Sequence, residues 1–469
     1  MHERSAGKTI VRHGAVPHRK EMTRMSARSW PRIFLSLFFL SGMASAFAGT
    51  EDRCLDAAKA AARWLASVQI KTEKGITWPS DPSDPNSVNV SLYAGTPGVI
   101  LFYLELHGAT GDPSALETAK AGANDLLNRL EAEGDASLYG GVAGIGYVLE
   151  EVFKATGDKA YRLGFLRALE KIRSAAVSKG AGVEWNTVTD IIGGSAGIGL
   201  FLLYADEELD DPYWLELAAK SGRRLLELGR SKSGGLDWAM DPGYPRLMPN
   251  FAHGTAGVSF FLTRLSERTK QKEFLDAALA GARYLQAIAK TDGDACLVFH
   301  HEPEGKDLFY LGWCHGPVGT AQLFHRLALV SGDPSWADWT RKGARGISSS
   351  GIPEARTPGF WNNAGLCCGL AGVADFFLSL YRAGKDPGDL AFCDRVTDAL
   401  LTAASVEDGR MKWVQAEHRT RPEFLVAQTG LMQGAAGIGL YLLRRDGFAR
   451  GRAPRIILPD SGFRPAVRR

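Results

Sequence analysis

A turn of the form Gly-x-x-Gly recurs seven times along the chain and constrains the fold more than any other feature. Each copy opens a segment that is apolar nearly all round, as at 99–104 and 198–203. A helix with apolar residues on every side is buried in a core. The chain is therefore an internal repeat that supplies seven buried helices. The first glycines of the turns are Gly95, Gly141, Gly194, Gly254, Gly316, Gly369 and Gly434.

A second helix is expected before each turn. These segments are richer in Ala, Lys, Arg and Glu, with apolar residues at helical spacing, as in Leu126, Leu127 and Leu130. That spacing is typical of a helix with one buried and one exposed face. Each repeat thus predicts one outer, half-exposed helix and one inner, buried helix. The outer helices are expected at 56–67, 113–133, 159–178, 213–230, 272–290, 336–348 and 389–405.

Seven buried helices need a closed arrangement, because an open row would expose the apolar flanks of its first and last members. The chain starts with an outer helix and ends with an inner one at 437–445. The predicted fold is all-α, an α/α toroid of seven inner and seven outer helices. All the turns would then lie on one rim, around the mouth of a central cavity. Glycine there permits positive φ and close backbone approach, although tight helix packing is the better explanation for most of them.

Two further patterns concern the loops. Three Gly-x-x-Trp pieces, ending at Trp78, Trp185 and Trp238, follow outer helices. We interpret them as short extended segments whose tryptophan packs under a loop, in preference to lining the cavity. Functional loops on a rigid scaffold are expected to be the long ones. The longest fall in the second half of the chain, at about 231–250, 291–312, 349–366 and 406–430.

The first 48 residues are typical of an export signal. Arg28 and Arg32 precede an apolar run at 33–40, and Ala46-Phe47-Ala48 fits an A-x-A cleavage site. The run is too short for a comfortable membrane span, which favours a cleaved signal over the alternative, an uncleaved amino-terminal anchor. The chain is thus predicted to consist of a targeting segment, 1–48, a toroid, 49–450, and a basic, flexible tail, 451–469. The mature protein is expected to be periplasmic or secreted.

Composition narrows the class of partner. The 469 residues are 45% hydrophobic and 23% charged, which is a globular balance with ample material for a large core. The net charge is +3, and no basic stripe runs along the chain. A nucleic-acid partner is therefore not expected.

Three of the six cysteines stand at the turns. Cys314 precedes Gly316 by two residues, and Cys367 and Cys368 immediately precede Gly369. On a toroid these turns belong to adjacent inner helices, so three thiolates converge. Three protein ligands and an open position are typical of catalytic zinc, which thiolates favour. The alternatives are a disulfide or buried free cysteines, as an oxidising compartment would suggest, or a fourth ligand from His315.

Two other turns carry groups suited to proton transfer. His253 immediately precedes Gly254, where the positive end of a helix dipole would lower the imidazole pKa and favour its neutral form. Asp190 lies four residues before Gly194 and could orient an imidazole, take a proton or cap the helix. The histidines of the long loops, His300, His301 and His418, show no spacing that pairs them and are interpreted as surface residues.

Taken together, the seven turns, Trp313-Cys314-His315-Gly316 and Cys367-Cys368-Gly369 resemble the lanthionine synthetase C-like family over about residues 54–463. The resemblance implies a sevenfold α/α toroid with a catalytic zinc ion at the cavity mouth. Bacterial members add a peptide cysteine thiol to a dehydroalanine or dehydrobutyrine and form a thioether ring. Eukaryotic members are associated with glutathione addition to similar electrophiles. The implied partner is a peptide or small thiol substrate with a dehydroamino acid.

The resemblance also assigns roles to residues. Cys314 and Cys367 fall on the two zinc cysteines, and Cys368 falls where many members have a histidine ligand and some have a cysteine. His253 falls on the histidine of a His-Gly-x-x-Gly turn, and Asp190 falls on an acid two repeats before the first zinc cysteine. By this resemblance His253 delivers a proton and Asp190 assists it.

The chain departs from bacterial cyclases in two respects. Tyr310 stands four residues before Cys314, where those cyclases carry an arginine, and His315 replaces the tyrosine that some of them have. The chain also carries no dehydratase or kinase-like segment, so the dehydroamino acid must come from elsewhere.

Two other functions fit an α/α toroid. A glycan hydrolase or epimerase would use paired carboxylates at the mouth, for which Asp237, Asp241 and Glu417 are candidates without a matched spacing. Such an enzyme has no need of the three cysteines. A non-catalytic, zinc-containing peptide-binding module is the other alternative.

Overall fold

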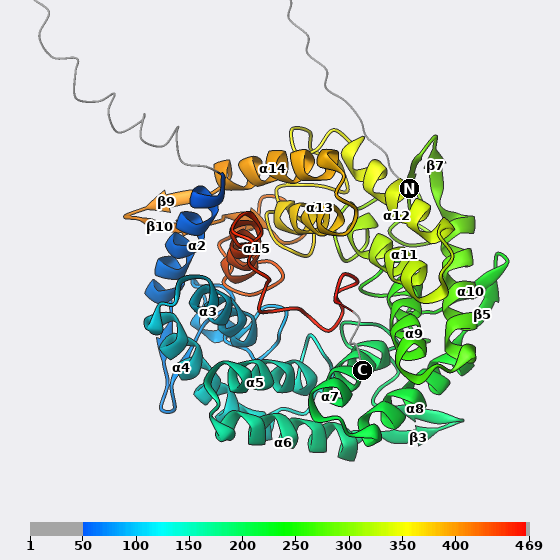
Figure 1. The fold of residues 1–469 in the computed structure, drawn as a ribbon, viewed down its shortest axis with the longest axis horizontal. Coiled ribbons are helices and arrows are strands. Elements are labelled where there is room, and N and C mark those ends of the chain that lie inside the picture. The colour runs from blue at the N-terminus through cyan, green and yellow to red at the C-terminus, as the bar shows by residue number, and fades with distance from the viewer. Residues whose placement is uncertain (1–49, 466–469) are drawn as a thin grey trace, which may run out of the picture. The chain divides into compact units, whose positions relative to one another are not determined.

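The computed structural model describes residues 50–465, and the expected targeting segment 1–48 lies outside the described residues. Within 50–465, fourteen α-helices form an inner and an outer ring (Figure 1). This confirms the predicted α/α toroid of seven inner and seven outer helices. The outer helices are α2 (Thr50–Ser67), α4 (Pro113–Arg129), α6 (Lys159–Ala175), α8 (Pro212–Leu228), α10 (Lys272–Ile288), α12 (Ser335–Ser348) and α14 (Pro387–Thr402). The inner helices are α3 (Thr96–Thr110), α5 (Val142–Thr156), α7 (Ser195–Leu209), α9 (Thr255–Thr269), α11 (Pro317–Ser331), α13 (Leu370–Gly384) and α15 (Ala435–Ala449).

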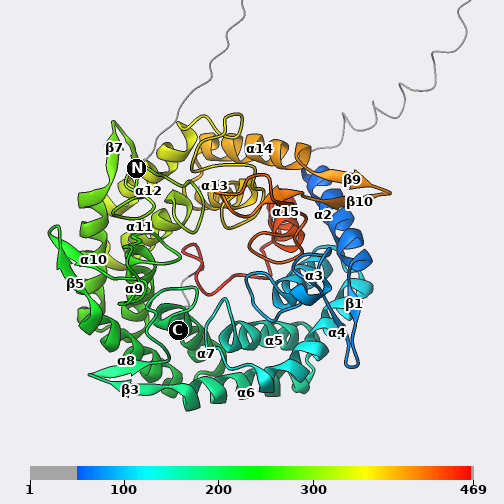
Figure 2. The ribbon, with the colours of Figure 1, turned by 180° about the vertical axis from the view of Figure 1, so that it is seen from behind.

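Each inner helix packs most closely on the outer helix that follows it in the chain. The residues between the two helices end the first helix and begin the second within a few positions. After α3, for example, Gly111 adopts a left-handed conformation, Asp112 caps the next helix through Ser114 N–H, and Pro113 begins it. The last inner helix, α15, has no following outer helix and packs instead on α2 and α3, as both views show (Figures 1 and 2). The first helix of the described chain, α2, and the last, α15, therefore close the ring.

The seven turns are joined by backbone hydrogen bonds into a closed circuit at one end of the inner helices. The residues concerned lie two or three positions before the first glycine of each turn. They are consequently held at fixed places around the cavity mouth. The bonds run from Tyr93 N to Tyr139 O, Tyr139 N to Ile192 O, Ile191 N to Ala252 O, Ala252 N to Cys314 O, Trp313 N to Cys367 O, Cys367 N to Met432 O, and Met432 N to Tyr93 O.

The glycines of these turns serve close packing and not a left-handed backbone. Gly316 has a φ of −138°, which any residue can adopt. A Cβ atom on Gly319, however, would lie 2.1 Å from the carbonyl oxygen of Trp313. The expectation of positive φ is therefore wrong here, while close backbone approach is confirmed.

The strands of the described chain form six two-stranded antiparallel hairpins, five of which follow outer helices. Trp78, Trp185 and Trp238 each donate a hydrogen bond from Nε1 to the carbonyl thirteen residues earlier, and Trp413 does the same. These tryptophans pack beneath the hairpins and join them to the ends of the outer helices, as the sequence predicts for the first three. The strands are β1 (Ile70–Lys71), β2 (Ile76–Thr77), β3 (Val177–Lys179), β4 (Gly182–Glu184), β5 (Arg230–Lys232), β6 (Gly235–Asp237), β7 (Lys290–Asp292), β8 (Ala295–Leu297), β9 (Ser405–Glu407), β10 (Arg410–Lys412), β11 (Gln415–Ala416) and β12 (Leu425–Val426), with 3-10 turns η2 (Pro85–Ser87) and η3 (Leu130–Ala132).

The chain after α15 crosses the hole of the ring (Figure 1). The sequence predicts a flexible tail over 451–469, but residues 451–465 are instead held by specific contacts. The Glu105 carboxylate accepts hydrogen bonds from the backbone N–H groups of Arg455 and Ile456, and Tyr139 Oη donates to Asp460 Oδ2. Because Glu105 lies in the second half of α3 and Tyr139 lies in the second turn, this segment runs through the hole from the end opposite the turns towards the turns themselves. Residues 466–469 lie outside the described chain.

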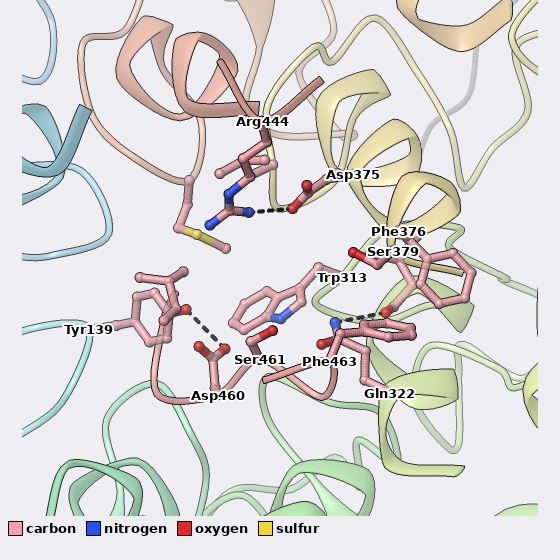
Figure 3. Close-up of a pocket in the computed structure, with 15 residues that line it drawn as sticks. Tyr139, Trp313, Gln322, Asp375, Phe376, Ser379, Arg444, Asp460, Ser461 and Phe463 are labelled. Atoms are coloured by element: carbon pink, nitrogen blue, oxygen red, sulfur yellow. Dashed lines mark hydrogen bonds and ion pairs between the residues drawn. The ribbon is translucent and has the colours of Figure 1, made fainter. Parts of the chain in front are cut away.

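A small chamber of about 80 Å³ remains between this segment and Trp313 (Figure 3). Asp460, Ser461 and Phe463 of the crossing segment line it, together with the Arg444–Asp375 ion pair. Within residues 50–465, no helix combines the length and the apolar character that a membrane crossing requires.

Candidate active site

The three cysteines of the turns meet at the mouth of the ring. The Sγ atoms of Cys314 and Cys368 are 3.2 Å apart, those of Cys368 and Cys367 are 3.4 Å apart, and all three lie within 4.8 Å of one another. Tetrahedral zinc with Zn–S bonds of about 2.3 Å places its sulfurs about 3.8 Å apart. The three buried thiols therefore fit a zinc ion with little movement. His315 does not belong to this cluster of ligand atoms.

The thiols also form a hydrogen-bonded set in which one is the preferred site of negative charge. Hydrogen bonds from Cys314 and then Cys368 hold the pKa of the Cys367 thiol well below its usual range. The hydrogen bond with Cys367, together with burial, raises the pKa of Cys314 well above its usual range. Hydrogen bonds with Cys314 and then Cys367 raise that of Cys368 in the same way. A cation at the centre of the cluster would supply the positive charge that allows all three to ionise.

Asp190 and His253 form the second part of the site. His253 Nδ1 lies 2.7 Å from Asp190 Oδ2, and the other oxygen of this buried carboxylate accepts a hydrogen bond from Gly193 N–H at 2.8 Å. Burial lowers the pKa of His253, but the hydrogen bond and the charge of Asp190 outweigh it and raise the pKa above its usual value. The helix-dipole argument predicts a lowered pKa and is wrong, because the paired carboxylate acts at much shorter range.

His315 lies between two other imidazoles. Its ring stacks on that of His300 at a centroid distance of 3.9 Å and on that of His253 at 5.5 Å. Its Nδ1 atom is buried without a hydrogen-bond partner. Burial lowers the pKa of His315 well below its usual value and lowers that of His300 to about 3. Both rings are therefore neutral near pH 7, which leaves His253 as the member of the stack that is most readily protonated.

The three cysteines and the three stacked histidines line one cavity of about 240 Å³, while the buried Asp190 reaches it through His253. Tyr310, in place of the arginine of bacterial cyclases, also faces it, and its hydroxyl is hydrogen-bonded to Arg419. A guanidinium thus reaches the cavity from the long loop at 406–430. Trp313 lines both this cavity and the chamber behind it, so its indole forms the partition between them. The lining residues are Tyr93, Ile192, Ala252, His253, His300, Tyr310, Trp313, Cys314, His315, Trp361, Cys367, Cys368, Glu417, His418, Arg419, Thr420 and Gln433.

Comparison with known proteins identifies the family. Residues 86–447 match the family described as lanthionine synthetase C-like protein. The chain belongs to this family. Glutathione S-transferase LANCL1 of Danio rerio is 23% identical over 310 residues, which cover 64% of this chain and 71% of that protein. The solved structure of nisin cyclase resembles the chain with a TM-score of 0.60 and 17% identity, over 88% of this chain and 97% of nisin cyclase. At that identity the likeness shows the shared toroid fold.

Three residues that line this cavity were not predicted from the sequence. Tyr93 and Gln433 stand two and one positions before the first glycine of their turns, as Cys314 and Cys368 do. Position in the turn is thus a signal that could have found them. Arg419 carries no such signal, because it comes from an irregular loop.

The interpretation of the loop histidines as surface residues is wrong for His300. His300, interpreted from sequence as a surface residue, is half-buried in the cavity, where it stacks on His315 and lies 2.8 Å from His301 between their Nδ1 atoms. His418 is exposed but stands at the edge of the same cavity.

The carboxylates proposed for a glycan hydrolase do not meet. Asp237 is buried in β6, where it forms an ion pair with Arg230 at 2.9 Å. Asp241 is half-buried and accepts a hydrogen bond from Thr187. Glu417 is the one carboxylate among the residues that line the cavity. A paired-carboxylate mechanism therefore has no support in this member of the family.

Proposed function

We propose that this chain is an exported, zinc-dependent enzyme that adds a thiol to a dehydroamino acid and forms a thioether. One observation carries the proposal. Three thiols within 4.8 Å of one another line a single cavity together with His253, which is hydrogen-bonded to the buried Asp190. Membership of the lanthionine synthetase C-like family supports it. The names of two similar proteins, nisin cyclase and glutathione S-transferase LANCL1, are consistent with thiol chemistry.

The three cysteines would hold the zinc ion. Bound there, zinc would offer an open coordination position that takes up a substrate thiol and lowers its pKa. The protein contributes a site with three thiols and no fourth cysteine, because Cys54, Cys296 and Cys393 are absent from the lining of the cavity. Three donors instead of four is the arrangement of a catalytic metal.

His253 would supply the proton. In the proposed reaction the thiol sulfur bonds to the β-carbon of the dehydro residue, and a proton is then added to the α-carbon. Asp190 engages Nδ1 of His253, so Nε2 is the atom free to donate that proton. The raised pKa of His253 keeps the imidazole protonated closer to neutral pH, as a general acid requires.

Arg419 would stabilise the negative charge that develops on the substrate carbonyl oxygen before protonation. Its guanidinium lines the cavity and is hydrogen-bonded to Tyr310. A fixed cation aimed at a developing oxyanion is a common source of rate enhancement. In this proposal Arg419 takes the place of the arginine that Tyr310 replaces in the sequence.

Export is part of the proposal and rests on residues 1–48. It places three thiols in an oxidising compartment, where the short distance between Cys314 and Cys368 would favour a disulfide in the metal-free protein. Bound metal would protect them, because a metal-bound thiolate is no longer free to attack another sulfur.

The test is a thiol-addition assay on the purified, zinc-loaded protein. Glutathione and a short peptide that contains dehydroalanine are incubated with it, and the thioether adduct is followed by mass spectrometry. We expect adduct formation that depends on enzyme and on zinc, and that is lost in Cys314→Ala. Cys296→Ala is the matched control, since this cysteine is buried outside the cavity, in β8, and its replacement should leave zinc content and turnover unchanged.

The outcomes separate the alternatives. Zinc binding and peptide binding without any adduct would favour the non-catalytic module. A protein that binds no zinc and forms no adduct would refute the proposed enzyme.

A further inference from the structure

The side chain of Gln433 is oriented by a chain of hydrogen bonds that begins at the backbone. Gly365 N–H donates to Asn363 Oδ1, so the amide nitrogen of Asn363 is the atom that faces Gln433. Asn363 Nδ2 donates to Gln433 Oε1 at 2.8 Å. The Nε2 group of Gln433 must then point the other way. Both residues are almost completely buried, so this orientation is not open to exchange with water.

The Nε2 group of Gln433 has two partners at the thiol cluster. It donates to the hydroxyl of Tyr93 at 3.0 Å and lies 3.9 Å from Cys368 Sγ, within range for a hydrogen bond to sulfur. Because the Tyr93 oxygen accepts from Gln433, its own hydrogen is free to be donated. It is available to Cys367, whose pKa the Tyr93 hydroxyl helps to lower.

We propose that Tyr93 and Gln433 are positioning residues that donate hydrogen bonds to the thiolates of Cys367 and Cys368 and thereby set the metal affinity of the site. This inference rests on the proposed zinc function. Three thiolates around a divalent cation leave a net negative charge in a buried cavity. Donors to sulfur offset that charge and disfavour protonation of the ligands.

Closure of the ring is what brings these donors to the cysteines. Tyr93 belongs to the first turn and Gln433 to the last, at opposite ends of the toroid sequence. Met432 N donates to Tyr93 O at 2.9 Å, and Cys367 N donates to Met432 O at 2.9 Å. The first, sixth and seventh turns therefore combine in one site, and an incompletely closed ring would lack the Tyr93 donor.

The test measures metal binding and not catalysis. Zinc affinity is determined by competition with a chromophoric chelator under reducing conditions, and the thiolate-to-metal charge-transfer band is recorded after cobalt(II) substitution. In Tyr93→Phe we expect an affinity about 10- to 100-fold lower, the usual effect of losing an outer-shell partner. The cobalt band should move to lower energy, because a thiolate without its donor is more electron-rich.

Gln433→Glu provides a second variant with the same shape. It keeps the acceptor for Asn363 and replaces the donor near Cys368 with a carboxylate oxygen, so its affinity should fall at least as far. Tyr103→Phe is the matched control, because it removes a buried tyrosine hydroxyl that donates to the carbonyl oxygen of Ala62, outside the cavity. It should keep the wild-type affinity and band position.

Two results would overturn the inference in distinguishable ways. If the wild type binds zinc and both Tyr93→Phe and Gln433→Glu match it in affinity and in cobalt spectrum, the donors have no role and the proposed function stands. If the folded wild type takes up neither metal, the zinc enzyme and this inference fail together.

Discussion

Asp190 Oδ2 lies 2.7 Å from His253 Nδ1, although the two residues are 63 positions apart in the sequence. They precede adjacent inner helices, α7 and α9, and the circuit of backbone bonds that joins the turns fixes their separation. The imidazole is consequently held by one nitrogen, with its other nitrogen free for a substrate. Neither residue alone indicates a function from the sequence, but the pair that they form makes His253 a candidate proton donor.

Replacement of His253 is therefore expected to impair catalysis without loss of metal. His253→Ala should keep zinc content and substrate affinity while thioether formation falls by about 10²- to 10⁴-fold, the usual contribution of a general acid. His253→Asn, which preserves some local hydrogen bonding but cannot supply the proton, should fail similarly. Zinc is measured by elemental analysis and turnover by mass spectrometry. Loss of zinc from either variant would make His253 a ligand instead.

The pH dependence follows from the Asp190 carboxylate. Since His253 acts in its protonated form, kcat/KM should fall as pH rises through its pKa, which Asp190 raises. In Asp190→Asn the charge is removed, so the pKa drops and this fall should begin at lower pH. Rates are measured across the pH range with glutathione and the dehydroalanine peptide. An unchanged profile in the variant would argue that Asp190 only caps its turn.

The third cysteine is the least certain ligand by family pattern and the best placed by geometry. Cys368 lies within 3.4 Å of both other sulfurs. Cys368→Ala should cut zinc content sharply while the far-ultraviolet circular dichroism stays helical, because the toroid core does not depend on the site. Full zinc occupancy in this variant would remove Cys368 from the ligand set.

The repeat predicted much of this arrangement because position within a turn determines place at the rim. Cys314, Cys367, Cys368 and His253 all stand one or two residues before a first glycine, and all reach the cavity. Tyr93 and Gln433 stand at the same positions of their turns. They were not predicted, because their side chains are not typical metal ligands or general acids and bases.

Other features could not be predicted from the sequence, because they lie in segments without a repeating pattern. Arg419 and His300 come from long loops, whose paths are set by tertiary packing. The segment after α15 looks flexible by its basic composition. It is held in place by partners that lie far away in sequence, such as Glu105 and Tyr139.

Export makes a separate prediction. If residues 1–48 are a cleaved signal, protein recovered from the cells that produce it naturally should begin at Gly49, as determined by intact-mass spectrometry. Replacing Ala46 and Ala48 with bulky residues should block the A-x-A site and leave a longer product. A full-length protein found only in the cytosol would contradict export and make peptide cyclisation before secretion the simpler role.

The segment that crosses the hole carries a buried acid whose charge should weaken the fold at neutral pH. Burial raises the pKa of Asp460 to about 6, and its Oδ1 atom has no hydrogen-bond partner. Because this is above the usual pKa of about 3.9, the folded state holds the proton more tightly than the unfolded state. The free energy of unfolding should therefore be highest, as far as this group is concerned, below about pH 4, and should fall as pH rises through 6. A difference of this size corresponds to about 3 kcal/mol.

Asp460→Asn tests this directly. The amide oxygen can still accept the hydrogen bond from Tyr139, while the charge is gone. The variant should be close to the wild type in stability near pH 4 and more stable by about 3 kcal/mol at pH 8. Chemical unfolding of the zinc-free, reduced protein at several pH values gives the comparison. Ser461→Ala, which alters the neighbouring residue of the same chamber without a change in charge, should follow the wild-type pH dependence. If the difference in free energy of unfolding between Asp460→Asn and the wild type does not grow with pH, the Asp460 carboxylate does not destabilise the folded state at neutral pH.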